Sequence, residues 1–351
     1  MNKKQWNGLA FFLKDKRKKN YLRIVYEFFY LWVLKKEIPW YYFKFLYRKN
    51  ISNIEDYLGT KEAYKVKHCP KYHRKEYIMV MDHKLSFSLF CKENNIPSTE
   101  LISYNFRTNF YLKGKLYKIN DHNELEEFFN QIWMMTEKDR FFVKPISAYG
   151  GAGARILEKS RIKVGLPSLY EELVGGDFIH EHILLQHKEI AQIYSKSVNT
   201  IRFETFIDAN SNVHVLSAFM RFGRGDSVVD NASSGGVYVG VNMDNGTLKE
   251  IAYEQANFGN EDYPMHPDTQ FVFGGFKIPF FKEACELVKL STEYLPDRYI
   301  GWDVAITENG PVILEANQDP GIFTSDVTYG GYLNHPIYNE ILDGVKDWVP
   351  N

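Results

Sequence analysis

Alternation of hydrophobic and polar residues in the second half of the chain predicts an antiparallel β-sheet. Apolar side chains recur at every second position, the period of a strand that buries one face, over 201–207, 214–222 and 237–241. Two further strands, expected over 302–307 and 312–315, flank Asn309-Gly310, and an Asn-Gly pair is a strong signal for a tight turn. We therefore expect a sheet whose last two strands form a hairpin near the C-terminus.

The remainder of the chain shows helix and strand patterns in turn. Helices are predicted over 82–95, 123–136 and 278–294. Shorter apolar stretches predict strands over 77–81, 99–104, 141–145, 154–157 and 177–185. Residues 14–50 favour helices, and Pro39, which suits a helix start, separates the apolar stretches 24–34 and 40–47.

Composition excludes several classes of protein. Hydrophobic residues make up 44% of the 351 residues and charged residues 25%, as in ordinary globular proteins. The three cysteines lie far apart without a CxxC pair, which argues against a disulfide framework and against a structural zinc site. No secretory signal and no apolar run of the roughly 18 to 20 residues that span a membrane is found. We expect a cytoplasmic protein.

Charge is distributed unevenly along the chain. Residues 1–50 contain 13 Lys and Arg against 3 Asp and Glu, so residues 51–351 carry a net charge of about −11. The first fifty residues are also rich in Phe, Trp and Tyr. Two interpretations stay open: these helices lie on an anionic membrane surface, or their aromatic side chains pack on the next lobe while the lysines are solvated.

Three oxygen-bearing side chains mark the ends of the predicted hairpin. Asp303 lies on its first strand, and Glu315 and Asn317 lie at the end of the second, on one face because side chains alternate. Two carboxylates and an amide suit Mg²⁺, which takes oxygen ligands together with nucleotide phosphates. The alternative is a surface hairpin with acidic ends.

A lysine precedes a glycine-rich turn. Lys144 lies on a predicted strand that leads into 147–153, where glycines let backbone N–H groups approach a phosphate closely. The spacing matches neither a Walker P-loop nor a GxGxxG fingerprint. A plain hairpin would have the same appearance.

Arginines follow on the predicted sheet. Arg202, at the end of Ser197-Val198-Asn199-Thr200-Ile201-Arg202, has the chemistry to hold a transferring phosphoryl group. A lone arginine is more often part of a surface ion pair, and the same alternative holds for Arg221 and Arg224.

These pieces occur in one order, and that order resembles the ATP-grasp superfamily. Within it, the chain resembles the sugar-transfer-associated ATP-grasp proteins of polysaccharide biosynthesis, over roughly residues 40 to 335. The matching strings are Gln186-His187, 197–202, Asp230-Asn231, Gly235-Gly236-Val237, 266–269, 301–307, Gly310-Pro311 and Glu315-Ala316-Asn317.

The resemblance implies an α+β fold of the ATP-grasp type, in which two α+β lobes grip ATP between them. A helical N-terminal segment (1–75) and a small α/β lobe (76–135) would precede the small grasp lobe (136–195), which carries the glycine-rich lid. The large lobe (196–345) would carry the magnesium site.

The resemblance also implies roles for individual residues. Arg202, Lys144 and Arg221 would stabilise the transferring phosphoryl group, and Asp303, Glu315 and Asn317 would hold Mg²⁺. Glu181 and Glu189 are the candidates for the ribose carboxylate, and His180 departs from the family pattern because an acidic residue is more usual there. ATP would be held by Lys84, Lys144, Ser147, Tyr149, Gly150, Gly151, Gly153, Glu181, His182, Ile183 and Glu189, while 318–325 would line the substrate pocket.

The implied reaction is ADP-forming ligation through an acyl phosphate. The substrates would be a sugar acid, free or lipid-linked, and an amine, with no nucleic acid involved and with peripheral membrane contact through 1–50 left open. Peptide ligation of free amino acids, a kinase acting on a small alcohol, and a non-catalytic nucleotide-binding role in a glycan assembly complex are the alternatives.

Overall fold

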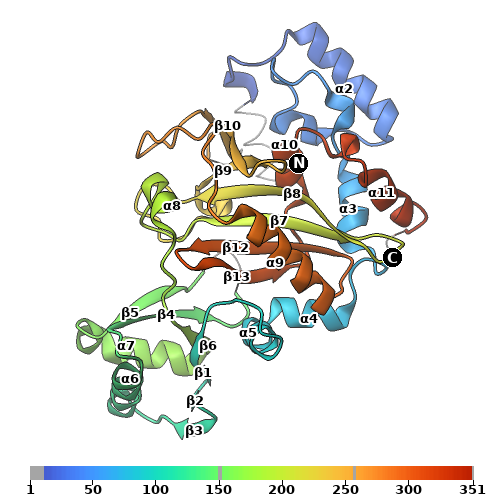
Figure 1. The fold of residues 1–351 in the computed structure, drawn as a ribbon. Coiled ribbons are helices and arrows are strands. Elements are labelled where there is room, and N and C mark those ends of the chain that lie inside the picture. Colours follow the sequence, from blue (N-terminus) through green and yellow to red (C-terminus); the bar gives the residue numbers. More distant parts are fainter. Residues whose placement is uncertain (1–11, 149–151, 256–257, 350–351) are drawn as a thin grey trace. The chain divides into compact units, whose positions relative to one another are not determined.

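The computed structural model describes residues 12–148, 152–255 and 258–349, and the chain divides into two units (Figure 1). The large unit comprises Met1–Ile78, Gln186–Pro311 and Asn317–Asn351, and the small unit comprises Met79–Leu185 and Val312–Ala316. The predicted residues Tyr149, Gly150 and Gly151 lie outside the described part of the chain.

A seven-stranded sheet, in the order β11-β10-β9-β8-β7-β12-β13, forms the centre of the large unit. Neighbouring strands are antiparallel from β11 to β12, as the alternating pattern predicted. The strands are β7 (Thr200–Ile207), β8 (Val213–Phe222), β9 (Val237–Asn242), β10 (Thr247–Glu254), β11 (Asp262–Tyr263), β12 (Tyr299–Thr307) and β13 (Gly310–Asn317).

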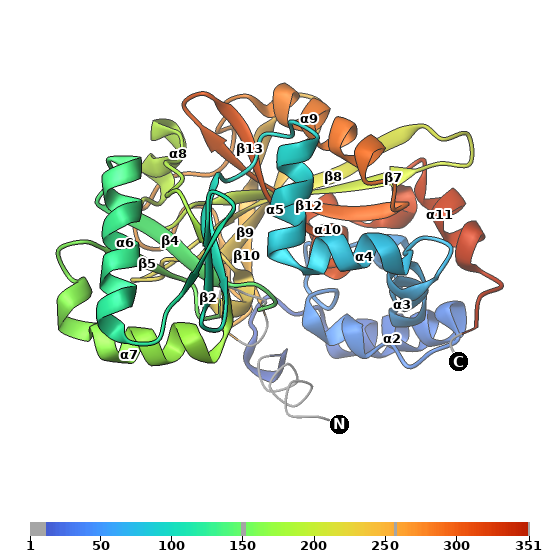
Figure 2. The same ribbon diagram turned by 90° about the horizontal axis from the view of Figure 1, so that it is seen from below.

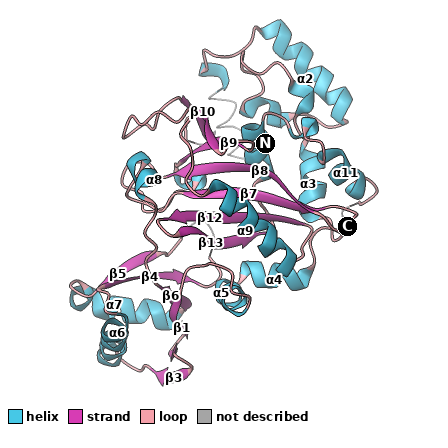
Figure 3. Ribbon diagram, viewed as in Figure 1, coloured by secondary structure: helices cyan, strands magenta, loops and turns pink. Residues whose placement is uncertain are grey.

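One face of this sheet packs on helix α9 (Phe281–Tyr294), which crosses β7, β8 and β12 (Figures 1 and 3). Thr205 and Trp302 contact this helix through Thr292, whose hydroxyl lies 2.9 Å from the Thr205 hydroxyl and 3.1 Å from the indole nitrogen. The Phe203 ring lies 5.7 Å from that of Phe281. This apolar face follows from the period-two pattern.

The opposite face packs on helix α10 (Ile322–Tyr329) and the short helix η4 (Tyr332–Asn334). Glu204 is fully buried there and accepts hydrogen bonds from the hydroxyls of Tyr299, Ser325 and Tyr332. The helix approaches closely at Gly240, where an added Cβ would lie 2.6 Å from the Thr328 carbonyl oxygen. A larger residue at 240 would therefore push α10 away from the sheet.

The N-terminal segment has a small core of its own. Helix α2 (Tyr21–Lys35) turns Ile24, Glu27 and Leu31 inward, and the Lys19 ammonium lies 2.6 Å from the Glu27 carboxylate. Aromatic residues of η1 (Trp40–Lys44) complete this core. The other helices of the large unit are η2 (Ile54–Asp56), α3 (Thr60–His68), α8 (Lys188–Ile193), η3 (Ala232–Ser234) and α11 (Tyr338–Val345), and the unit boundary falls within α4 (Lys75–Asp82).

The small unit contains a six-stranded sheet in the order β3-β2-β1-β6-β4-β5, with every pairing antiparallel. Its strands are β1 (Leu101–Phe106), β2 (Asn109–Leu112), β3 (Lys115–Lys118), β4 (Arg140–Pro145), β5 (Arg155–Glu158) and β6 (Asp177–Glu181). Helices α6 (His122–Thr136) and α7 (Ile162–Gly175) share an aromatic core with this sheet, which Figure 2 shows from below. The third helix of the unit is α5 (Lys84–Glu93).

The strand predicted over Tyr77–Met81 is wrong, because these residues belong to helix α4. A run of five apolar residues does not distinguish a strand from a helical turn by its periodicity. Two further predicted elements are longer than those observed, since 40–47 forms η1 over Trp40–Lys44 and 177–185 forms β6 over Asp177–Glu181. No described helix has the length and apolarity that crossing a bilayer requires.

Truncating the buried face of α2 should destabilise the large unit. Leu31 is fully buried, so Leu31→Ala is expected to cost about 2–5 kcal/mol of unfolding free energy. Leu22 on the same helix is 86% exposed, and Leu22→Ala is the matched control. Denaturant titration of both variants measures the difference, and equal midpoints would show that α2 does not pack as described.

Candidate functional site

Two arginines hold one buried carboxylate in the large unit. Asp303 on β12 lies opposite Arg202 on β7, and the guanidinium donates from Nε and Nη2 to the two carboxylate oxygens at 2.5 and 2.9 Å. Arg221 on β8 places Nη2 3.0 Å from Oδ2 of the same carboxylate. Each of these three residues is less than a tenth exposed. The register places all three on the sheet face that carries α10.

Electrostatics keep this carboxylate ionised. Burial by itself raises the pKa of Asp303, but the adjacent guanidiniums of Arg202 and Arg221 outweigh burial, and the net pKa is lowered. Asp303 is therefore charged at neutral pH although water is excluded.

Neighbouring polar groups position the two arginines. Arg221 donates to the Thr200 hydroxyl, which in turn donates to Asp230 at 2.5 Å. Burial raises the pKa of Asp230, against the opposing effect of Arg221. Arg202 donates from Nη1 to the Pro320 carbonyl oxygen at 2.8 Å. Sequence reasoning gave Thr200 and Asp230 no role, although both lie in strings that match the family pattern.

A second charged group lies within the small unit. Lys144 on β4 is 2.9 Å from Glu181 on β6, and the Thr99 hydroxyl donates to the other oxygen of Glu181 at 2.9 Å. Lys84, at the start of α5, lies 3.8 Å from Glu315 and donates to the Ala148 carbonyl oxygen. The structure thus brings together both lysines predicted to bind phosphate and two of the predicted carboxylates.

The two lysines differ in their electrostatic environment. Burial lowers the pKa of Lys84, and the ammonium of Lys144 lowers it further. Burial acts in the same direction on Lys144, but the carboxylates of Glu181 and Glu315 outweigh it and raise its pKa. Lys144 is therefore charged at neutral pH, and it lies near the end of β4, shortly before the glycine-rich turn.

The residues of β6, which the resemblance implied would hold adenine, differ in part from the family pattern. His180 is fully buried among the rings of Phe110, Phe129 and Phe141, and burial lowers its pKa to about 3. It is therefore a neutral core residue. Beyond it, the backbone N–H of His182 donates to the Glu100 carbonyl oxygen at 3.0 Å.

The ribose and adenine contacts stay predictions. Glu181 is buried against Lys144, whereas Glu189 is exposed in the first turn of α8. Ile183 follows β6 and is partly exposed. Of the predicted lid, Ser147 and Gly153 are described, and Gly153 has a φ of 74°, a conformation that favours glycine.

The expected magnesium ligands have the right chemistry. Asp303 and Glu315 supply carboxylate oxygens and Asn317 an amide carbonyl oxygen, the ligand types that Mg²⁺ takes, while the buried amide nitrogen Nδ2 of Asn317 has no hydrogen-bond partner among the described residues. Within the described part of the chain, no three His, Cys, Asp or Glu side chains form a metal-binding group. Asp303 and Asn317 belong to the large unit and Glu315 to the small unit, and the assignment of Mg²⁺ to these three residues stays a prediction.

Comparison with known proteins gives one family assignment. A family model described as sugar-transfer associated ATP-grasp matches residues 64–340. No curated protein matches the chain.

Solved structures with a similar arrangement include several ligases. The ATP-grasp ligase PsnB complexed with a minimal precursor aligns with 13% identity and a TM-score of 0.43, over 78% of this chain and 63% of that one. D-Alanine–D-alanine ligase from Bacillus anthracis aligns with 12% identity and a TM-score of 0.42, over 75% and 67%. Phosphoribosylamine–glycine ligase from Thermotoga maritima aligns with 15% identity and a TM-score of 0.45, over 77% and 56%.

Removing the charge of Asp303 should destabilise the large unit. Asp303→Asn removes the carboxylate partner of the buried Arg202 and leaves Arg221 with Asp230 at 3.4 Å, and breaking a buried pair in this way costs about 3–5 kcal/mol. Denaturant unfolding measures the loss. Asp226→Asn, which removes an exposed pair with Lys196, is the control and should leave the midpoint unchanged. A stable Asp303→Asn variant would contradict the charge-pairing argument.

Proposed function

This chain belongs to the sugar-transfer-associated ATP-grasp family, and we propose that it is an ATP-dependent carboxylate–amine ligase. The observation that carries the proposal is the buried Asp303 carboxylate, which two guanidiniums keep ionised on one face of the large sheet. A carboxylate kept charged without solvent, next to arginines, suits a site that handles phosphate charge.

The chemistry divides into two displacements. A carboxylate oxygen of the acid attacks the γ-phosphorus of ATP, so that an acyl phosphate forms and ADP leaves. The nitrogen of the amine then attacks the acyl carbon, phosphate leaves, and the nitrogen loses a proton to give the amide. Neither step needs a protein nucleophile, so the residues of the chain act by binding, orientation and charge stabilisation.

The residues of this chain divide that work. Lys144, kept charged by Glu181 and Glu315, would bind nucleotide phosphates, and Lys84 would add a second ammonium. Arg202 and Arg221 would stabilise the equatorial oxygens of the phosphoryl group. Asp303, Glu315 and Asn317 would hold Mg²⁺, which neutralises charge on the phosphate oxygens when bound.

The proposed acid is a sugar acid or a glycan precursor, and the amine an amino acid or another small amine, in the biosynthesis of a bacterial polysaccharide. The description of the family as sugar-transfer associated supports this choice over peptide ligation of free amino acids. The charged groups at Lys144 and Asp303 are of the kind that stabilise a transferring phosphoryl group, which supports catalysis over a non-catalytic nucleotide-binding role.

Loss of the Glu315 carboxylate should abolish turnover. Glu315→Gln is expected to lower metal-dependent ADP formation by more than about a hundredfold, because a ligand contributes more than the outer-shell groups whose loss costs 10–100-fold. The assay follows phosphate release and product mass with Mg-ATP, uronic acids and amino acids. Glu308→Gln, in the β12–β13 turn, is the control. Equal activity of both variants would remove Glu315 from the mechanism.

We also propose that α2 lies on an anionic membrane surface. Only one side of α2 is buried, and large apolar side chains on the rest of the helix are exposed to solvent. The most exposed are Leu22 at 86%, Val33 at 79% and Tyr26 at 68%. Scattered exposed apolar residues are normal, but a clustered patch marks an interaction site.

Charge around the helix favours lipid over a neutral partner. Lys14, Lys16 and Lys36 are exposed beside α2, and Tyr and Trp side chains such as Trp32 suit the headgroup region. The other side of the same helix packs in the core of the N-terminal segment, where Ile24 and Leu31 are buried.

Two charges on the exposed face should release the protein from vesicles. Leu22→Glu combined with Val33→Glu should abolish co-sedimentation with vesicles of phosphatidylcholine and phosphatidylglycerol, because carboxylates oppose both burial and anionic lipid. Val349→Glu changes an exposed apolar residue elsewhere and is the control. If neither protein sediments, and the double variant instead dissociates a dimer in light scattering, a second copy of the chain covers this face.

A further inference from the structure

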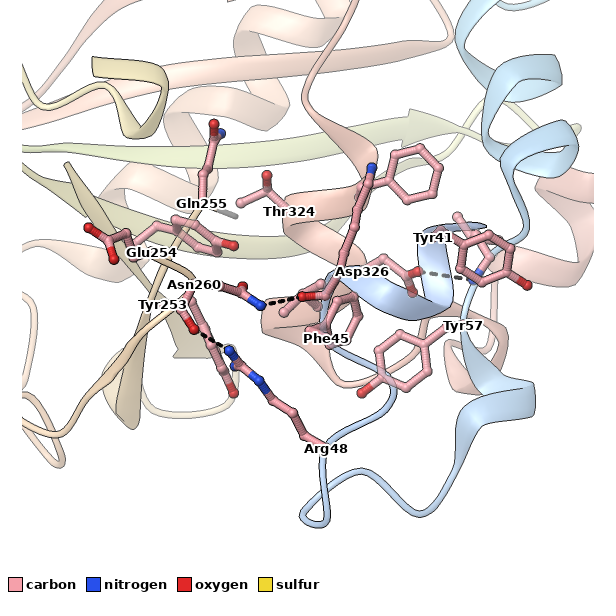
Figure 4. A pocket seen from close by; sticks show the side chains of 15 residues that line it. Tyr41, Phe45, Arg48, Tyr57, Tyr253, Glu254, Gln255, Asn260, Thr324 and Asp326 are labelled. Carbon is pink, nitrogen blue, oxygen red and sulfur yellow. Dashed lines mark hydrogen bonds between the residues drawn. The ribbon is translucent and has the colours of Figure 1, made fainter. Parts of the chain in front are cut away.

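A cavity of about 250 Å³ lies within the large unit, and none of the charged residues described above lines it (Figure 4). Its lining comes from three parts of the chain: residues 41–58 of the N-terminal segment, β9 and β10 with the loop that follows, and α10. In Figure 4, Phe45 and Tyr57 approach from the N-terminal segment, and Tyr253 and Glu254 from β10. The N-terminal contribution precedes the region matched by the family model, which begins at residue 64.

Aromatic rings form most of the apolar wall. Phe45 and Tyr57 pack edge to face with ring centroids 5.2 Å apart, and Tyr238 and Tyr253 lie 6.0 Å apart. Phe323 of α10 adds another ring. Aromatic faces offer a flat apolar surface, and tyrosine adds a hydroxyl for polar contact. Such a wall suits a ring-shaped ligand that has one apolar face and several polar substituents.

Of the charged side chains that line the cavity, one lysine is available to bind a ligand. Arg48 is neutralised, with Nη1 2.5 Å from Asp262 and Nε 3.4 Å from Asp15. Glu254 lies 2.8 Å from Arg224. Lys44, by contrast, forms no ion pair with any carboxylate in the described part of the chain.

The surroundings of Lys44 suit a ligand anion. Its ammonium lies 4.8 Å from the ring centroid of Phe323, and its side chain is exposed. An anionic group on a ligand would form a charge-assisted hydrogen bond with the ammonium of this lysine.

Polar groups surround the remainder of the cavity. Asp326 accepts backbone hydrogen bonds from Leu58 at 3.0 Å and Tyr332 at 2.7 Å, and burial raises its pKa to about 7. Asn260, Gln255 and Thr324 supply amides and a hydroxyl to the lining. These groups can exchange hydrogen bonds with hydroxyl substituents of a ligand.

Strand register connects this cavity to the charged site. Tyr238 pairs directly with Arg221 on β8 and with Tyr253 on β10, so all three side chains lie on the same face of the sheet. That face also carries Arg202 and Asp303. The cavity wall therefore begins one strand away from Arg221, about 5 Å across the sheet.

We infer that this cavity binds a sugar ring that carries an anionic substituent, with the ring against the aromatic wall and the anion beside Lys44. The choice of a sugar over another ring rests on the proposed function. The anion is a phosphate on the anomeric carbon or the carboxylate of a uronic acid, which share the charge that Lys44 requires. A ligand held here lies on the sheet face where Arg202 and Arg221 would stabilise phosphoryl transfer.

The test is equilibrium binding of four sugars to the full chain by calorimetry: glucose, glucose 1-phosphate, glucuronic acid and glucuronic acid 1-phosphate. At least one anionic sugar should bind about ten- to a hundredfold more tightly than glucose, the range expected for a charge-assisted hydrogen bond. Comparison of glucose 1-phosphate with glucuronic acid then identifies the anion. Saturation-transfer NMR should show contact between the ring protons of the sugar and the protein.

A matched pair of variants locates the binding. Lys44→Met keeps the alkyl chain on Phe323 and should lose the preference for anionic sugars, whereas Lys49→Met, at an exposed position outside the cavity lining, should retain it. Mg-ATP binding, measured in the same proteins, reports on the proposed function separately. Equal binding of glucose and the anionic sugars, or an unchanged preference in Lys44→Met, would overturn the inference whether or not the chain proves to be a ligase.

Discussion

The pairing of buried charge on one face of the seven-stranded sheet is the constraint on which the large unit depends. Asp303, Arg202 and Arg221 are each less than a tenth exposed, and an isolated charge at such positions would cost several kcal/mol. The carboxylate is therefore shared by two guanidiniums, and each guanidinium has a further acceptor, the Pro320 carbonyl or the Thr200 hydroxyl. These contacts connect β7, β8 and β12 to the segment that leads into α10.

Alternation along the strands makes this arrangement compatible with a stable core. The face that packs on α9 is apolar, with Trp302 and Phe203 buried, so the opposite face can carry charge without loss of the main hydrophobic contact. The second face carries different kinds of side chain in different places. Glu204 is buried beneath α10, the two arginines lie on β7 and β8, and the aromatic pair Tyr238 and Tyr253 lies on β9 and β10. One sheet surface thus provides structural, electrostatic and binding regions.

Sequence patterns predicted the parts of this structure that depend on local periodicity. Five of the seven strands of the large sheet, the hairpin at Asn309-Gly310 and the α+β ATP-grasp family were confirmed, because alternation and turn chemistry are encoded within a few residues, whereas β10 and β11 went unpredicted. Local patterns failed at 77–81, where a short apolar run formed a helix, and at α7, which went unpredicted and contains Pro167. The partners of Asp303 were beyond local reasoning, because Arg202 lies about a hundred residues away in the chain.

The N-terminal segment shows most clearly why the remaining features could not be predicted. Its basic and aromatic composition suggested a surface element, but Arg48 is 2% exposed and pairs with Asp262, more than two hundred residues along the chain. Lys19 is likewise buried against Glu27. Part of the positive charge of this segment therefore stabilises the interior, while its exposed lysines and the outer face of α2 stay in solvent. Composition gave the net charge of the segment, but only the ion pairs of the folded structure decide which charges are available to a membrane or a ligand. Lys44 is available because it forms no ion pair with a carboxylate in the described structure.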